Sequence, residues 1–193
     1  MKTKHFLTAA LMAMCAMATT MFTACGSDSD DNNNNGGKKG PVSAGLVCSL
    51  MTDDETLLNF DFYAKYYDAN GQVQTEKVVW GEKRNEQGYR IWTKTVTAKL
   101  PATLGMHCQI KAKEGVEYDP NTRYMVGHGF LITSSLLDEA CKSLSDVPGY
   151  VSEYIVSRIR QGSIYEFLEN ENNFLNVVYY FDANGNRTNG NWN

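Results

Sequence analysis

An alternation of apolar and polar residues within residues 57–67 restricts most strongly what this chain can fold into. Successive side chains of a β-strand point to opposite faces of the sheet, so period two predicts a strand with one buried face. The apolar face would hold Phe60, Phe62, Ala64 and Tyr66, and the polar face Asn59, Asp61, Tyr63, Lys65 and Tyr67. Asn70-Gly71 separates this run from a second strand-like run at 72–80. Because both residues tolerate a positive φ, the pair predicts a tight hairpin.

Further strand-like runs follow the same pattern along the chain. They cover residues 44–51, 89–99, 106–113, 124–133 and 174–181, and clusters of turn residues at 81–88, 101–105, 114–115 and 119–122 separate several of them. Short strands with regular turn punctuation are typical of a β-sandwich.

Between Ser135 and Leu168 the apolar spacing changes from two residues to three or four. The first stripe is Leu136, Leu137, Ala140, Cys141 and Leu144, and the second is Val147, Val151, Tyr154, Ile155 and Ile159. Ser135 and Asp138 have the spacing of a capping box, Asp146 could cap the second stripe, and Gly162 could end it. Ser163 and Glu166 form another capping-box pattern over Ile164, Phe167 and Leu168. This spacing predicts helices.

Taken together, these patterns predict a mainly β fold. We expect an immunoglobulin-like β-sandwich with a helical insertion before the last strand, formed by residues 41–193 as a single globular domain. The alternative is an α+β fold in which helices cover one sheet. The composition, with 42% hydrophobic and 21% charged residues, is that of an ordinary globular protein.

The N-terminal residues have the pattern of a targeting signal. Lys2 and Lys4 precede an apolar stretch at 6–18 that is shorter than the ~20 residues a membrane span needs, as in a secretory signal peptide. Small residues then lead to Cys25, and this resembles a bacterial lipobox. The resemblance implies a signal peptide at 1–24 and a lipid on Cys25. The alternative is an ordinary signal peptide in which the cysteine occurs by chance.

An acidic run follows Cys25 directly and contains Ser27, Asp28, Asp30 and Asp31. It resembles the export signal of Bacteroidetes-type surface lipoproteins of the outer membrane. The resemblance implies a lipid-anchored protein that faces the cell exterior; the alternative is an acidic spacer on a lipoprotein that faces the periplasm. Residues 25–40 lack apolar side chains that could compensate the entropy of ordering, so we expect a flexible tether that holds the domain off the membrane.

The folded part contains three cysteines. An exported protein can form disulfides, and Cys48 with Cys108, on two expected strands, is the favoured pair. The alternative is that Cys48, Cys108 and Cys141 are buried thiols that pack as small apolar groups. His107 adjoins Cys108, but neighbours in a strand point to opposite faces, so the two cannot act together as a nucleophile and base.

Catalytic and metal-binding motifs are not evident. Zinc needs three or four ligands at recognisable spacing, and neither His107 nor His128 has such neighbours in the sequence, so we expect no metal and no cofactor. The glycines beside His128 suggest a bulge or a close backbone approach. Many carboxylates could serve a glycan hydrolase, but nothing singles out a pair, and we expect Asp53-Asp54-Glu55 to decorate a loop.

Aromatic residues are the most suggestive functional feature. Tyr63 and Tyr67 fall on the polar face of their strand, and with Trp80 and Trp92 they are candidate ligand-binding residues, because rings beside polar groups suit carbohydrate or protein. The alternative is that these rings complete the core. The net charge of −4 argues against nucleic acid.

We therefore expect a non-catalytic, surface-exposed lipoprotein that binds a polysaccharide or an envelope or host protein. The alternatives are a glycan-active envelope hydrolase and a periplasmic structural or inhibitor-like lipoprotein. Such a lipoprotein could dock a partner through a sheet edge.

Overall fold

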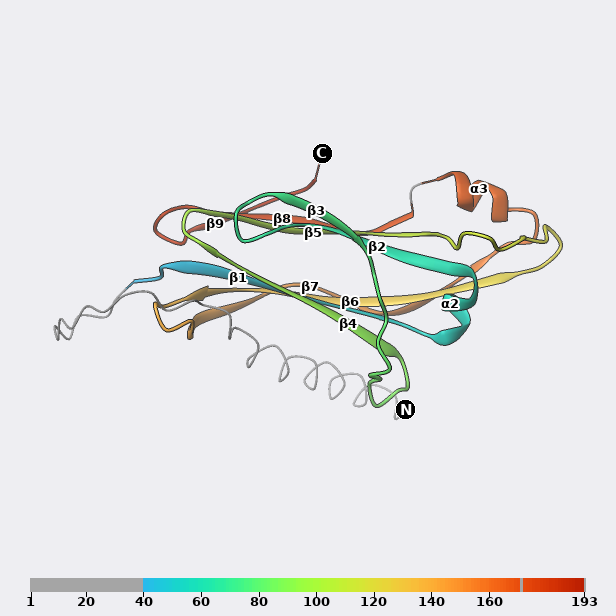
Figure 1. The fold of residues 1–193 in the computed structure, drawn as a ribbon, viewed down its shortest axis with the longest axis horizontal. Coiled ribbons are helices and arrows are strands. Elements are labelled where there is room, and N and C mark those ends of the chain that lie inside the picture. Colours follow the sequence, from blue (N-terminus) through green and yellow to red (C-terminus); the bar gives the residue numbers. More distant parts are fainter. Residues whose placement is uncertain (1–39, 171, 193) are drawn as a thin grey trace, which may run out of the picture.

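Two antiparallel β-sheets packed face to face make up the fold, with very little helix, as Figure 1 shows. The structure, a computed structural model, describes residues 40–170 and 172–192. The expected signal peptide at 1–24 and residues 25–39 of the expected tether, including Cys25, lie outside the described residues. The strands are β1 (Ser43–Thr52), β2 (Phe60–Tyr67), β3 (Val73–Lys77), β4 (Arg90–Lys99), β5 (Ala102–Ala112), β6 (Tyr124–Leu137), β7 (Ser143–Ile159), β8 (Asn172–Phe181) and β9 (Arg187–Gly190).

The four-stranded sheet has the order β4-β1-β6-β7, which places β1 between two partners distant in sequence. Cys48 lies opposite Lys94 on β4 and opposite Ile132 on β6. Nine of the ten β1 residues are buried, with Ser49 half-buried. A strand covered on both faces needs apolar or small residues throughout, and the β1 sequence SAGLVCSLMT meets that need.

The five-stranded sheet has the order β3-β2-β5-β8-β9, and its strand β2 confirms the predicted alternation. Phe60, Phe62, Ala64 and Tyr66 are all buried. The hairpin to β3 is also confirmed: Asp68 N donates to Gln72 O at 2.8 Å, and Gly71 has φ 75°. The odd-numbered β2 residues therefore point away from the other sheet.

The hydrophobic core lies between the sheets. Its largest fully buried side chains come from both layers: Tyr179, Phe60, Phe62, Leu46, Leu50, Leu104, Met106 and Ile132. Phe62 meets Trp80 and Phe174 edge-on, with ring centroids 5.2 and 5.9 Å apart. Burying one such side chain stabilises the fold by about 1.5–3 kcal/mol, and these three rings stabilise the inner face of the five-stranded sheet and the segment that follows β3.

The prediction of a helical insertion before the last strand is wrong for most of the segment concerned. The residues of the two longer apolar stripes lie in β6, in β7 and in the turn between them, so a β-hairpin replaces the helices. The α+β alternative fails for the same reason. Only the third pattern forms a helix, α3 (Ile164–Glu169), and its N-cap Ser163 makes no side-chain capping bond.

Irregularities in the β6–β7 pairing account for the misleading spacing. The register shifts three times, between His128 and Phe130, between Ile132 and Thr133, and between Leu136 and Leu137. A bulge adds one residue to a strand and so moves the alternation out of phase. Apolar residues three or four apart can then arise in a strand, where the sequence alone suggests a helical stripe.

One type of turn closes three of the hairpins. An aspartate at its first position accepts backbone N–H bonds from the second and fourth residues after it, and the residue three positions on has a positive φ. The pairs are Asp68 with Gly71, Asp138 with Cys141, and Asp182 with Gly185. In the β6–β7 turn the residue three positions after the aspartate is Cys141, φ 58°, so a search for glycine misses this turn.

Candidate ligand-binding face

A shallow cavity of about 330 Å³ opens on the outer face of the five-stranded sheet. Its lining combines two aromatic side chains with several side chains that can donate or accept hydrogen bonds. The lining residues are Tyr63, Ala64, Lys65, Thr75, His107, Gln109, Asn173, Asn176 and Trp192. We refer to this cavity as the outer-face pocket.

Strand register brings the polar lining residues together. On β2 and β5, Tyr63 lies opposite Gln109 and Lys65 lies opposite His107. On the other side, His107 lies opposite Asn176 of β8. Cross-strand partners point to the same face of a sheet, so the neighbouring strands β2, β5 and β8 present these groups side by side. The sheet is a rigid scaffold and needs no loop to hold them.

Trp192 folds back over this face and forms one wall of the outer-face pocket. Its backbone N donates to Asn176 Oδ1 at 2.8 Å, and its ring stacks on Tyr67 with centroids 4.3 Å apart and an interplanar angle of 11°. The Lys65 ammonium lies 4.8 Å from the ring centroid. The indole Nε1 is buried and has no hydrogen-bond partner in the described part of the chain. Trp192 therefore contributes an aromatic ring to the outer-face pocket.

A lysine ammonium group lies over each of the two aromatic rings that line the outer-face pocket. The Lys111 ammonium is 5.3 Å from the centroid of the Tyr63 ring, and the Lys65 ammonium is 4.8 Å from the centroid of the Trp192 ring. Asp61 instead pairs with Lys77, Nζ to Oδ2 2.6 Å, and this contact raises the pKa of Lys77.

Burial, with a smaller effect from Tyr180, raises the pKa of the Tyr67 phenol. The phenol therefore stays protonated at neutral pH and can donate a hydrogen bond.

Of the four aromatic residues proposed from the sequence, the structure brings two to this face. Tyr63 lines the outer-face pocket, and Tyr67 supports Trp192. Trp80 and Trp92 are partly buried and pack against the core. Sequence reasoning missed Gln109, Asn173 and Asn176, because their position beside Tyr63 and His107 depends on the pairing of β2 with β5 and of β5 with β8.

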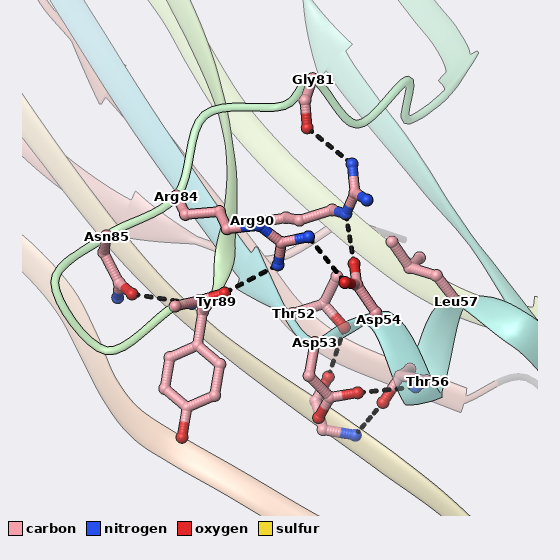
Figure 2. A network of polar contacts seen from close by, with 12 residues as sticks. Thr52, Asp53, Asp54, Thr56, Leu57, Gly81, Arg84, Asn85, Tyr89 and Arg90 are labelled. Atoms are coloured by element: carbon pink, nitrogen blue, oxygen red, sulfur yellow. Dashed lines mark hydrogen bonds and ion pairs between the residues drawn. The ribbon is translucent and has the colours of Figure 1, made fainter.

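A second polar cluster lies where β1 passes into the helix α2 (Asp54–Asn59), as Figure 2 shows. Asp53 caps this helix, because its Oδ1 accepts from Thr56 N at 2.6 Å. Two buried threonines tie the same corner to β6: Thr52 Oγ1 donates to Gly127 O, and Gly127 N donates to Thr56 Oγ1, both at 2.7 Å. The acidic segment at 53–55 is therefore a helix start and not the expected loop decoration.

The remaining carboxylate oxygens of this cluster are also engaged. Asp53 Oδ2 accepts a hydrogen bond from the Tyr154 hydroxyl, and the Tyr154 ring stacks on Tyr89 at 3.8 Å. Burial and the Asp53 carboxylate raise the pKa of Tyr154 far above its usual range.

Arg84 Nη2 and Arg90 Nε lie 2.6 and 2.5 Å from the two oxygens of Asp54, as the dashed lines in Figure 2 mark. The side-chain bonds to Arg90 and Arg84 lower the pKa of Asp54. Carboxylates used in this way brace the corner and are not poised for acid–base chemistry.

Cys48 of β1 and Cys108 of β5 are brought together across the core. Both are fully buried free thiols. Burial, and after it a hydrogen bond with Cys48, raises the pKa of the Cys108 thiol. The structure thus places the favoured pair in contact, and their oxidation to a disulfide stays a prediction.

The glycines that flank His128 have the close-approach role the sequence suggested. A Cβ on Gly127 would overlap the Tyr154 hydroxyl and Asp53, and a Cβ on Gly129 would lie 3.0 Å from Met51 Cγ. The His128 ring packs against Phe174 at 4.8 Å, and burial lowers its pKa.

Residues 40–170 and 172–192 contain no group of three or more His, Cys, Asp or Glu that could hold a metal ion. No helix among the described residues is long and apolar enough to cross a membrane. Comparison with family models, curated proteins and solved structures gave no match.

Proposed function

We propose that this protein is a non-catalytic lipoprotein whose outer-face pocket binds a glycan. The observation that carries the proposal is the pairing of Trp192 and Tyr63 with polar groups from four strands in one cavity. Sugar rings present apolar C–H faces that pack on aromatic rings, and their hydroxyls pair with amide, hydroxyl and imidazole groups. The amides of Gln109, Asn173 and Asn176 can each both donate and accept.

The composition of the outer-face pocket favours binding over hydrolysis. Glycosidases of the common types need two carboxylates flanking the scissile bond. The described residues that line this pocket include no aspartate or glutamate. The carboxylates Asp53 and Asp54 are already engaged by Tyr154, Arg84 and Arg90.

The proposed location rests on the N-terminal sequence. A lipid on Cys25, with the acidic run at Ser27, Asp28, Asp30 and Asp31, would anchor the domain in the outer membrane facing the exterior. Protease shaving of intact cells tests this, with lysed cells and a periplasmic protein as controls. Loss of the domain from intact cells is expected; protection until lysis would contradict surface exposure and favour a periplasmic protein partner.

The finer fold class proposed is immunoglobulin-like. The pairs β1–β4 and β2–β5, with β3 and β8 outside the second pair, match strands B–E and C–F with their neighbours C′ and G. Cys48 and Cys108 would then stand on the B and F equivalents, where antibody domains carry their cross-sheet disulfide. The β6–β7 hairpin would be the insertion. Strand pairings measured by NMR test this, and pairing of β1 with β2 would contradict it.

A binding screen tests the glycan proposal. The purified full chain is run through gels that contain soluble polysaccharides, and retarded migration reports binding. We expect Trp192→Ala and Tyr63→Ala to weaken binding about 10-fold or more, because a stacked ring contributes about 1–3 kcal/mol to such contacts. Tyr165→Ala is the matched control, since Tyr165 is 51% exposed on α3 and does not line the outer-face pocket.

Two results would overturn the proposal. The first is that no polysaccharide retards the chain while a protein partner is captured and its binding is unaffected by Trp192→Ala. The second is that both pocket variants, shown by thermal melting to be folded, bind glycans as well as the Tyr165→Ala control.

A further inference from the structure

We infer that the outer-face pocket selects an acidic saccharide, one that carries a carboxylate or sulfate on its ring. This inference rests on the proposed glycan-binding function and names its substrate class. The charge of this face differs in sign from that of the chain. The chain as a whole is acidic, with 22 Asp and Glu against 18 Lys and Arg.

The outward face of the five-stranded sheet has the opposite sign. On strands β2, β3, β5 and β8, which are fully described, the outward residues include Lys65, Lys77 and Lys111 against the single carboxylate Asp61. Lys77 neutralises Asp61 through the 2.6 Å ion pair. Lys65 and Lys111 form no ion pair with any described residue, so their charges remain available.

The ammonium groups of Lys65 and Lys111 lie close to where the substituents of a sugar stacked on Trp192 or Tyr63 would be. Lys65 lies over the Trp192 ring at 4.8 Å and Lys111 over the Tyr63 ring at 5.3 Å, and both rings line the outer-face pocket. A sugar stacked on either ring would displace or adjoin the ammonium group. An anionic substituent would keep that lysine as a partner, whereas a neutral sugar would lose the cation–π contact without replacing it.

The pocket also lacks a feature that would repel an anion. None of its described lining residues carries a carboxylate, and its hydrogen-bonding groups are the Lys65 ammonium, amides, hydroxyls and an imidazole. This arrangement distinguishes an acidic saccharide from a neutral one by charge and from a simple anion by ring stacking.

Matched polysaccharides test the inference with the full chain. The pairs are polygalacturonate with its methyl ester, and dextran sulfate with dextran; the first pair tests a carboxylate and the second a sulfate. Dissociation constants are measured by titration calorimetry at two salt concentrations. We expect at least one acidic member to bind about 10-fold or more tightly than its neutral partner.

Three variants separate the contributions. Lys65→Met and Lys111→Met keep the apolar stem and remove the charge, so each should lower affinity for the acidic glycan about 2- to 5-fold and reduce its salt dependence. Lys99→Met is the control, because Lys99 is an exposed lysine of the other sheet. Trp192→Ala should weaken binding of acidic and neutral glycans alike.

The outcomes distinguish the two proposals. Equal affinity for acidic and neutral partners, with loss of both in Trp192→Ala, would overturn the acidic preference and leave glycan binding intact. Binding of dextran sulfate that Trp192→Ala and Tyr63→Ala leave unchanged would show surface ion exchange and overturn both. If Lys65→Met and Lys111→Met shift the acidic-to-neutral ratio no more than Lys99→Met, the assigned charges are wrong.

Discussion

Replacing Gly127 by alanine should destabilise the fold through one identifiable overlap. The added Cβ would lie 2.8 Å from Tyr154 Cζ and closer still to the phenol oxygen and the Asp53 carboxylate. The Tyr154 ring cannot retreat freely because it stacks on Tyr89 at 3.8 Å. Relief of the overlap therefore breaks the hydrogen bond from Tyr154 to Asp53.

The cost has two parts of similar size. Loss of a hydrogen bond to a charged group costs about 1.5–3 kcal/mol, and the lower figure applies because Tyr154 is half-buried. Displacement of the stacked ring adds about 1.5 kcal/mol, typical of overpacking. The sum is about 3 kcal/mol, which corresponds to a fall in Tm of about 6–12 °C for a domain of this size.

Chemical denaturation and thermal melting of the Gly127→Ala variant measure this loss. Gly81→Ala is the control, because a Cβ there meets nothing nearer than Lys83 N at 3.9 Å. In a Tyr154→Ala background both parts are already absent, so most of the cost of Gly127→Ala should disappear and only the overlap with the Asp53 carboxylate should remain. A Gly127→Ala protein as stable as the control, or an unchanged cost in that background, would refute the reasoning.

Three further predictions concern single residues. Gly71→Ala should cost about 1 kcal/mol in urea denaturation, because its φ of 75° disfavours any side chain, whereas Gly81→Ala should be neutral; equal effects would contradict this. In the folded, reduced protein at pH 8, iodoacetamide should modify neither Cys48 nor Cys108, and both should react after unfolding, as peptide mapping would report; rapid labelling of either would show that the core is open. Burial holds the pKa of His128 below its usual 6.5, so the unfolded chain binds a proton first as the pH falls. The free energy of unfolding should therefore decrease as the pH falls from about 6.5 through the lowered pKa of His128 in the folded protein. His128→Phe should remove this decrease. An NMR titration that gives His128 a pKa at or above 6.5 would contradict the assignment.

The sheets were predictable wherever alternation ran undisturbed. Strand β2 and its hairpin follow from a regular period of two ended by Asn-Gly, and both are confirmed. The same period places Tyr63 and Tyr67 on the outward face. The partners of β1, in contrast, come from distant strands that no local pattern identifies.

The β6–β7 hairpin was missed for two physical reasons. Its bulges break the alternation, and its turn has Cys141 where the other two turns of this type have glycine. Comparison of the three aspartate turns would have helped, since Asp138 has the same relation to Cys141 as Asp68 has to Gly71. Helix α2 was also open to prediction, because Asp53 followed by Asp54 and Glu55 is a capping residue with an acidic first turn.

The outer-face pocket could be predicted only in part. Its tyrosines lie on a strand whose phase is readable, but Trp192 reaches it from beyond the last strand, and Asn173 and Asn176 depend on the pairing of β5 with β8. Such neighbours are set by sheet order. Sequence spacing within one strand does not contain that information.

The interior position of β1 has a mechanical consequence if the proposed lipid on Cys25 holds the domain by its N-terminal side. Hydrogen bonds already join Val42 N to Leu137 O at 2.9 Å and Leu100 N to Val42 O at 3.0 Å, so both ladders begin one residue ahead of the strand. A pull on residue 40 can extract β1 only by breaking its bonds with β4 and β6 together. Tension from a ligand held on the opposite sheet would cross the core to reach this strand, which is bonded on both sides.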